Sequence, residues 1–459
     1  MLFSSLTFLY LFLPATGLLY LAAPPRWRNA VLLAVSLWFY YWGEPVYTLL
    51  LFGSSLSDYA HSLYIERHRG TRWATAALVN SIVLNLGLLA VFKYADFLLS
   101  IWNSLTGQQV PLPHLALPVG ISFFTFQTMS YTIDVYRGDV HAERNLATLA
   151  TYVCLFPQLV AGPIVRYADV AAQLHQRELT VENAAAGLRR FVVGLGKKVL
   201  IANVLGELAA GYRAAAAPSV GYAWLYALGF TLQIYFDFSA YSDMAIGLGR
   251  VFGFTFPENF NYPYLACSIT EFWRRWHMSL STWFRDYVYI PLGGNRRGHA
   301  RQIRNLLVVW ALTGLWHGAA WNFVLWGALF GLVLIGEKFL WGKALSRLPR
   351  AAGWVYTMVL VVVSFVIFNA DSLSGAAADL HHLAGGLPLS SAETVYQLRS
   401  YGGVLLAALL GATPLPARAG RWLQARLPLL EPVLLAVLLL VSTAFLVDGS
   451  FNPFLYFRF

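Results

Sequence analysis

The sequence predicts an all-α, polytopic membrane protein, and three observations support that fold class. The 459 residues are 58% hydrophobic with a mean hydropathy of +0.57, and only 12% are charged, about half the charged fraction of an average soluble domain. Apolar segments recur along nearly the whole length, and basic residues gather in short stretches between them. We therefore expect roughly 10–12 transmembrane helices, with re-entrant and interfacial helices, in a single domain covering residues 1–459.

Each expected span is an apolar segment whose side follows from the basic residues beside it. Arg26 and Arg28 follow the first segment, which has no basic residues before it, so we expect a first span that starts outside rather than a cleaved signal peptide. The same reasoning leaves the C-terminus outside. The expected spans lie near residues 1–23, 29–42, 45–66, 75–103, 118–136, 191–212, 219–249, 352–370, 400–415 and 430–447.

Two apolar blocks have basic residues on both sides and are too short to cross twice. Residues 146–161 contain Pro157 and predict a re-entrant or interfacial hairpin. Residues 306–334 number 29, whereas two crossings need roughly 40. Residues 306–334 are therefore predicted to form a re-entrant hairpin that breaks near Gly314 to Gly318.

His317 is the only ionisable side chain of residues 306–334 and is expected near the tip of that hairpin, beside a cavity. Non-helical backbone at membrane depth is tolerated only where protein or a water-filled cavity covers it. An ionisable group there is a functional-site hypothesis by default, and imidazole suits proton transfer near neutral pH. A histidine hydrogen-bonded between helices is the structural alternative.

Residues 268–290 predict an interfacial amphipathic helix that contains His277. Ser268 and Glu271 have capping-box spacing, and aromatic residues recur at helical intervals through the segment. Glu271 can pair with Arg274 or Arg275. The same arginines are expected partners of Asp237 and Asp243, two acids inside an apolar span, where structural ion pairs are as good an explanation as catalysis.

Charge and motifs exclude several classes of function. The net charge of +10 is typical of loops that face anionic lipid, so the bilayer is an expected partner and nucleic acid is not. Cys154 and Cys267 have no metal-ligand spacing, and CxxC, HExxH, GxSxG and Walker motifs are absent from the sequence. A buried histidine instead suits a general base that acts on an acceptor hydroxyl while an activated thioester supplies the acyl group.

Several segments together resemble the membrane-bound O-acyltransferases, and in particular the bacterial branch that serves alginate O-acetylation. They read FQTMSYTIDVYRG (126–138), FPQLVAGPIVRY (156–167), YFDFSAYSDMAIGLG (235–249), ENFNYPYLACSITEFWRRWHMSLSTWFRDYVYIPLGGNRRG (258–298), LTGLWHGAAWNFVLWG (312–327) and the ending FNPFLYFRF. The resemblance implies a funnel of helices around an intramembrane chamber, with His317 as the catalytic histidine. It implies that His277, the second motif histidine, is also catalytic, as the functional partner of His317 or as a donor-side group. The sequence departs from the resemblance at Asn369, where relatives commonly carry arginine, and between residues 371 and 430, which look shorter.

The resemblance also implies a reaction and its participants. The donor is acetyl-CoA or an acyl-carrier thioester on the cytoplasmic side, with no bound cofactor and no metal. The acyl group crosses the bacterial inner membrane and reaches a cell-surface polysaccharide, such as alginate, with an SGNH-type acetyltransferase outside and a polysaccharide synthase complex as partners. We expect Trp276, Arg274, Arg275, Asp237 and Asn322 near the donor or in the chamber lining.

Two other classes of function stay open on the residues alone. A proton-coupled transporter or flippase for an envelope polysaccharide precursor would also use many spans and a buried histidine, although no internal inverted repeat is visible. A structural scaffold for a synthase complex is the third class. The polymer itself is equally open, because acetylated cellulose, other exopolysaccharides, peptidoglycan and D-alanylated teichoic acid are alternatives to alginate.

Overall fold

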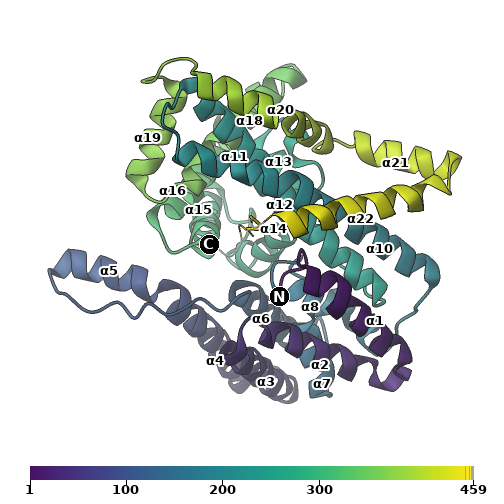
Figure 1. Ribbon diagram of the computed structural model, residues 1–459. Coiled ribbons are helices and arrows are strands. Elements are labelled where there is room, and N and C mark those ends of the chain that lie inside the picture. The colour runs from purple at the N-terminus through teal and green to yellow at the C-terminus, as the bar shows by residue number, and fades with distance from the viewer. Residues whose placement is uncertain (450, 454, 456–459) are drawn as a thin grey trace. The chain divides into compact units, whose positions relative to one another are not determined.

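The described chain, residues 1–449, 451–453 and 455 of a computed structural model, is helical and contains no strand (Figure 1). This confirms the all-α prediction. The chain divides into two compact units. The first comprises residues 1–191 and 242–257, and the second comprises residues 192–241 and 258–459.

The first unit is built around α6, in which 14 of 17 residues are buried. Helices α3, α4, α7 and α9 pack against it. Gly43, Glu44 and Pro45 separate α2 from α3, as expected from the sequence, and a π-helical turn joins α4 to α5 in one long rod. The helices of this unit are α1 (Leu13–Ala22, preceded by a π-helical turn at Phe8–Phe12), α2 (Arg28–Tyr41), α3 (Pro45–Arg67), α4 (Arg72–Leu89), α5 (Ala95–Thr106), α6 (Ile121–Arg137), α7 (Leu146–Cys154), α8 (Phe156–Leu159), α9 (Tyr167–His175) and most of α10 (Val181–Gly196).

A buried carboxylate joins three helices of the first unit. Asp58 of α3 is 1% exposed and accepts hydrogen bonds from Ser81 and Asn85 of α4, at 2.6 and 2.9 Å. Thr128 of α6 donates to the Asn85 side chain at 3.1 Å. Hydrogen bonds of this kind hold helices together where no hydrophobic force acts between them. Asp58 was not among the residues to which the sequence predicted a role.

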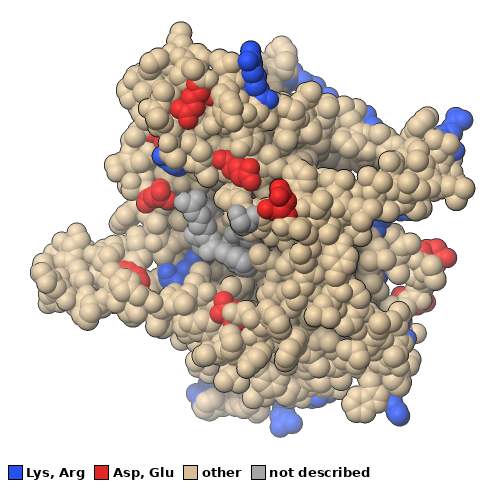
Figure 2. All heavy atoms as spheres, in the orientation of Figure 1, with Lys and Arg blue, Asp and Glu red and all other residues tan. Residues whose placement is uncertain are grey.

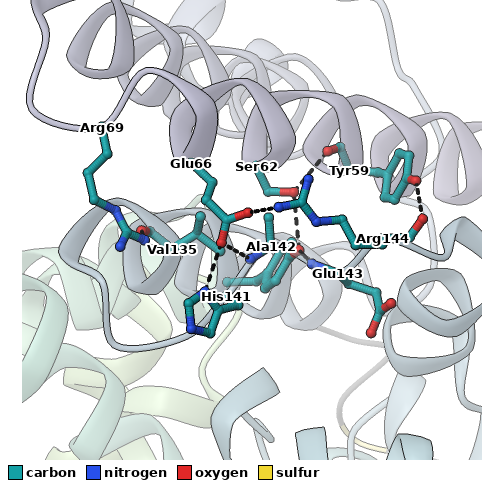
Figure 3. A network of polar contacts seen from close by, with 10 residues as sticks. Tyr59, Ser62, Glu66, Arg69, Val135, His141, Ala142, Glu143 and Arg144 are labelled. Carbon is teal, nitrogen blue, oxygen red and sulfur yellow. Dashed lines mark hydrogen bonds and ion pairs between the residues drawn. The ribbon is translucent and has the colours of Figure 1, made fainter.

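A second polar network lies at the end of α3, and Figure 3 shows its residues converging from α3 and the loop after α6. The Glu66 carboxylate accepts from Arg144, from the Ala142 N–H at 3.0 Å and from His141 Nδ1 at 3.1 Å. Burial alone would raise the pKa of Glu66, but these hydrogen bonds and the Arg144 charge outweigh it and hold the pKa below its ordinary value. The loop is thus fastened to α3 through one ionised carboxylate.

The lowered pKa of Glu66 predicts a pH-dependent contribution to stability. A carboxyl group whose pKa is lower in the folded than in the unfolded state stabilises the fold above its unfolded pKa, and that contribution disappears as the pH falls through the folded pKa. Glu66→Gln should therefore lower the free energy of unfolding by on the order of 1 kcal/mol at neutral pH. The difference from the unmodified protein should shrink as the pH falls below 4.5, the ordinary carboxyl value.

Thermal unfolding of the purified protein in detergent at several pH values measures this contribution. Glu182→Gln is the matched control, because Glu182 is exposed at the start of α10. A Glu66→Gln difference that stayed constant across the acidic range would show that ionisation of Glu66 contributes nothing.

The second unit contains the long helix α12 up to residue 241 and the helices that follow residue 258. Its helices are α11 (Val204–Arg213), α12 (Val220–Val251), α13 (Ile269–Arg275), α14 (Met278–Phe284), α15 (His299–His317), α16 (Trp321–Gly336), α17 (Gly342–Leu345), α18 (Arg350–Asn369), α19 (Leu373–Ala384), α20 (Ala392–Gly411), α21 (Leu415–Arg426) and α22 (Leu430–Asp448). A π-helical segment, Lys197–Asn203, connects α10 to α11, and another, Arg285–Tyr289, follows α14.

Helices α15 and α16 form a tightly packed hairpin. A Cβ atom on Gly314 would lie 2.5 Å from the Phe323 carbonyl oxygen, and one on Gly327 would lie 2.5 Å from the Trp310 carbonyl oxygen. Small residues at such contacts let two backbones approach closely. The chain turns at residues 318–320, slightly later than the predicted break at Gly314 to Gly318.

The helices of the hairpin extend beyond the apolar block 306–334 on which the length argument rested. The first arm, α15, has 19 residues, and the second continues through a π-helical turn to Leu345 over 25 residues. At 1.5 Å per residue the second arm is about 37 Å long, enough to cross a bilayer. The out-and-back path is present, and a re-entrant depth stays a prediction.

The apolar helices identify a multi-pass membrane protein, and the exact number of spans stays a prediction. Among the described residues four segments are long and apolar enough to cross a bilayer, and the bent pair α20 and α21 is a fifth if counted as one span. Those four are 72–106, 321–345, 350–369 and 430–448. Helices such as α3, which carries Asp58 and several buried serines, resemble spans in the sequence but are less apolar.

The surface fits a lipid environment. Figure 2 shows a face that is largely without lysine, arginine, aspartate or glutamate side chains. Many large apolar side chains are exposed, among them Leu18 at 71%, Leu49 at 78% and Leu440 at 66%. Apolar surface on this scale indicates contact with a membrane rather than with water.

Candidate functional site

His317 lines a small enclosed cavity inside the second unit. The cavity has a volume of about 20 Å³, which is room for about one water molecule. Its walls come from α12, α15, α16, α18, the link between α13 and α14, and one residue near the C-terminus. The lining residues are Ile234, Asp237, Phe238, Trp276, His317, Trp326, Phe365, Phe368 and Leu455.

The imidazole of His317 is held by aromatic edges. His317 is the last residue of α15 and is 8% exposed. Its ring lies 5.0 Å from that of Trp326 and 5.4 Å from that of Phe368, both in edge-to-face geometry. The next residue must be small, because a Cβ atom on Gly318 would lie 2.2 Å from the Phe323 ring. The Trp-His-Gly sequence thus ends the helix with the histidine facing the cavity.

His277 lies at a break in the predicted interfacial helix, so that prediction of one continuous helix over 268–290 was wrong. The Ser268 side chain caps α13 as expected, accepting from the Glu271 N–H at 3.0 Å. The helix then stops at Arg275, and His277 adopts the left-handed conformation with φ of 45° before α14 begins. A non-glycine residue in this conformation costs on the order of 1–3 kcal/mol and persists only when its surroundings fix it.

Asn259 fixes His277 in that conformation. Its Oδ1 lies 3.2 Å from Nδ1 of His277 and 2.9 Å from the Ser279 hydroxyl, and its backbone carbonyl accepts from the Met278 N–H. Because Oδ1 can only accept, Nδ1 carries the proton and Nε2 is the acceptor nitrogen. Burial lowers the pKa of His277 to about 3, which keeps the ring neutral.

The two histidines belong to one aromatic cluster. His277 packs 5.8 Å from the ring of Trp316, the neighbour of His317 in sequence, and 4.7 Å from Phe238, which lines the cavity. Sequence motifs 40 residues apart are therefore brought together. Trp276 and Asp237 also line the cavity with His317.

Asp237 has a different partner from the arginines that were predicted. Its carboxylate lies 2.6 Å from the Lys198 ammonium group, and both side chains are less than 5% exposed. Its other oxygen accepts from the Leu455 N–H at 2.9 Å, while Lys198 also donates to the Pro453 carbonyl oxygen. The pairing with Arg274 or Arg275 was wrong because a partner on the preceding helix is available. The buried pair anchors Pro453 and Leu455, and Leu455 lines the cavity.

The remaining predicted site residues lie outside the cavity lining. Arg274 is exposed, and Arg275 pairs with Glu271 at 2.8 Å. Asn322 is buried and donates to two carbonyl oxygens at the end of α18, those of Phe368 and Ala370. Asn322 thus stabilises the end of α18, the helix that contributes Phe365 and Phe368 to the cavity wall.

Asp243, in the first unit, was also predicted to pair with Arg274 or Arg275. It pairs with Arg190 at 2.8 Å instead. As with Asp237, the partner is a basic residue of α10 or its continuation rather than of the later arginine-rich segment.

Several site residues were missed by sequence reasoning. Lys198 carried a usable signal, since a lysine inside an expected span needs a buried partner. Asn259 and Leu455 carried none, because an ordinary loop asparagine and a terminal leucine gain their roles only through long-range packing. The aromatic walls Phe365 and Phe368 read as lipid-facing residues of a span.

The fold and the site define a multi-pass helical membrane protein in which His317 lines a small aromatic cavity and His277 packs against Trp316, the neighbour of His317. The profile of the membrane-bound O-acyltransferase family, MBOAT, matches residues 142–373. The chain belongs to this family, and it is an O-acyltransferase.

Curated relatives cover most of the chain. A "probable alginate O-acetylase" of Pseudomonas aeruginosa is 48% identical over 82% of this chain and 73% of its own length. A peptidoglycan O-acetyltransferase of Helicobacter pylori is 35% identical over 84% of this chain and 80% of its own. A teichoic acid D-alanyltransferase of Bacillus subtilis is 28% identical over 62% and 76%. The family profile, over residues 142–373, includes the cavity residues of α12, α15 and α16.

Proposed function

We propose that this protein is a membrane O-acetyltransferase that takes an acetyl group from a cytoplasmic thioester and passes it across the membrane for O-acetylation of a cell-surface polysaccharide such as alginate. The observation that carries the proposal is His317 in an enclosed aromatic chamber of a chain 48% identical to a relative named for alginate O-acetylation. Relatives named for peptidoglycan and teichoic acid support an envelope polymer as acceptor.

His317 acts as the general base. Its imidazole accepts the proton of the acceptor hydroxyl as the oxygen attacks the thioester carbonyl, which gives a tetrahedral intermediate. The carbon–sulfur bond then breaks, and the imidazolium returns the proton to the departing thiolate. Aromatic walls exclude water, which would otherwise hydrolyse the thioester. His277 is a positioning residue that is neutral and held through Asn259.

The size of the chamber supports a small acyl group. The cavity has a volume of about 20 Å³, and large rings of Trp276, Trp326, Phe365 and Phe368 form its walls. An acetyl group needs little rearrangement of these side chains, whereas a long acyl chain would displace several of them. A sugar residue would not fit beside His317, which favours transfer through the hydroxyl of a small side chain on a partner.

The partners and the location are part of the proposal. We place the protein in the bacterial inner membrane with both termini outside, because the basic segments are then cytoplasmic. An SGNH-type acetyltransferase on the outer side receives the acyl group, within a polysaccharide synthase complex. The donor is acetyl-CoA or an acyl-carrier thioester, and no metal or bound cofactor takes part.

Arg274 is the best candidate to contact the phosphates of the donor, since it is an exposed cation two residues before Trp276 of the cavity wall. Arg274→Ala should raise the KM for the donor about 5- to 10-fold and leave kcat nearly unchanged, as expected for losing one charge-assisted contact. Arg301→Ala removes an exposed arginine of α15 and is the control. Equal donor KM values for the two variants would remove Arg274 from the donor site.

The proposed function is tested with purified full-length protein and acetyl-labelled donor. Incubation with labelled acetyl-CoA, or with a labelled acyl-carrier protein, in the presence of the outer partner should consume the thioester and label the partner. A transporter or a scaffold would leave the thioester intact. Absence of thioester consumption with both donors, under conditions where the partner is bound, would refute the proposal.

A further inference from the structure

Two half-buried arginines, Arg28 and Arg177, lie in the first unit, formed by residues 1–191 and 242–257, and take no part in the proposed reaction. The guanidinium groups of Arg28 and Arg177 lie over the same Tyr20 ring, 5.6 and 5.9 Å from its centroid. Arg177 also lies 4.6 Å from the ring centroid of Phe254. Two like charges thus contact the same aromatic ring.

Both guanidinium groups keep a buried donor without a hydrogen-bond partner. These donors are Nε of Arg28 and Nη1 of Arg177. Among the described residues, the charged or ionisable groups that act on Arg177 are Tyr20 and Arg28, neither of which is a carboxylate. Burial, and to a lesser extent the charge of Arg28, hold the pKa of Arg177 below its ordinary value although Tyr20 opposes them. The pair therefore lacks a counter-charge.

Arg177 is also held in place before any ligand arrives. Its Nη2 donates to Asn29 Oδ1 at 2.7 Å, and Asn29 in turn donates to the Leu174 carbonyl oxygen at 2.8 Å. The loop after α12 packs against the aliphatic part of the Arg177 side chain, since a Cβ atom on Gly253 would lie 3.2 Å from Cβ of Arg177. A preorganised cation loses less conformational entropy on binding an anion.

We propose that Arg28 and Arg177 form a binding site for a phosphate group. A guanidinium fork matches phosphate oxygens in geometry and charge, and a bound phosphate would supply partners for both unpaired donors. The cost of burying two like charges without a counter-ion falls when an anion binds between them. The rings of Tyr20 and Phe254 orient the guanidinium groups that lie over them. The ring faces cannot accept hydrogen bonds from N–H groups that point along the guanidinium plane.

Two sources of phosphate are available at this place in the fold. Arg28 begins α2 directly after the Pro-Pro-Arg-Trp turn, and Arg177 follows α9. Both belong to basic segments that we place on the cytoplasmic side, where phospholipid headgroups and soluble phosphorylated donors meet. The site stands independently of the reaction proposed for His317, because it lies in the other unit and is tested by binding alone.

The test is equilibrium binding to the purified full-length protein in a neutral detergent. One arm uses short-chain phosphatidylglycerol with diacylglycerol as its phosphate-free counterpart, and the other uses coenzyme A with pantetheine. The variants are Arg177→Gln and Arg28→Gln. Arg26→Gln is the matched control, because Arg26 is an exposed arginine of the same turn.

The expected result is that at least one phosphate-bearing probe binds more tightly than its counterpart, and that Arg177→Gln and Arg28→Gln each weaken this binding by about tenfold or more. Arg26→Gln should bind as the unmodified protein does. Loss in the lipid arm assigns the site to a headgroup, and loss in the coenzyme arm assigns it to a soluble donor. Binding that is equal in Arg177→Gln, Arg28→Gln and Arg26→Gln, or no preference for either phosphate-bearing probe, would overturn the proposal and leave a structural cation–π cluster.

Discussion

His317→Ala is expected to abolish acetyl transfer while the protein still folds and inserts. General base catalysis by a positioned side chain contributes about 10²- to 10⁴-fold, and no second titratable group on the cavity wall other than the paired Asp237 is available to replace it among the described lining residues. Truncation leaves a void between Trp326 and Phe368, so we expect a modest loss of stability rather than unfolding. The measurement is transfer of labelled acetyl to the outer partner.

Two further variants make this result specific. His317→Gln keeps a polar side chain of similar length but cannot carry the proton, so it should be as inactive as the alanine variant. His299→Ala removes an exposed histidine at the other end of α15 and should retain activity. Transfer that persists in His317→Gln at a rate near that of His299→Ala would remove proton transfer by His317 from the mechanism.

Breaking the buried pair of Lys198 and Asp237 should have the largest effect on stability. Both side chains are less than 5% exposed, and removing one partner of such a pair leaves an uncompensated charge, at a cost of about 3–5 kcal/mol. Lys198→Met should therefore lower the free energy of unfolding strongly and weaken the attachment of Pro453 and Leu455, which the pair holds. Chemical denaturation in detergent measures this loss.

The double variant separates a broken pair from a packing defect. Lys198→Met combined with Asp237→Leu removes both charges, and replacing a buried pair with apolar residues is often neutral or stabilising. Stability should then recover, while activity stays low because Pro453 and Leu455 each lose a hydrogen bond that holds them to the second unit. Arg275→Ala, which removes an exposed pair with Glu271, should change stability by less than about 1 kcal/mol. A Lys198→Met variant as stable as Arg275→Ala would contradict the structural role of the pair.

Local sequence signals predicted the helices well. Breaks at Gly43, Glu44 and Pro45 and at residues 318–320 come from residues that end helices, and such signals are local. Local signals do not decide which helices cross the bilayer, because an apolar span and a protein-buried helix have similar composition. Asp58 makes α3 too polar for lipid alone, yet its partners on α4 satisfy the carboxylate inside the unit.

Site residues could be predicted where an ionisable side chain is unusual for its segment. They could not be predicted where long-range packing determines the contacts. His317 stood out because no other ionisable residue occurs in its segment. The break at His277 could not be foreseen, since Trp276 and His277 fit a helical pattern and only Asn259 makes the left-handed turn stable. The partner of Asp237 was missed because proximity in the fold, rather than the number of arginines nearby, determines ion pairs.

The anchoring of Leu455 has a consequence for how the protein is made. The Asp237 carboxylate and the N–H that it binds are 218 residues apart in sequence. At a translation rate of roughly 5–20 residues per second, about 10 to 40 seconds separate the synthesis of the two. During that interval Lys198 can already hold Asp237, but the chamber around His317 still lacks one wall. Enzyme competence is therefore acquired late in biosynthesis, after the membrane helices of the second unit have been inserted.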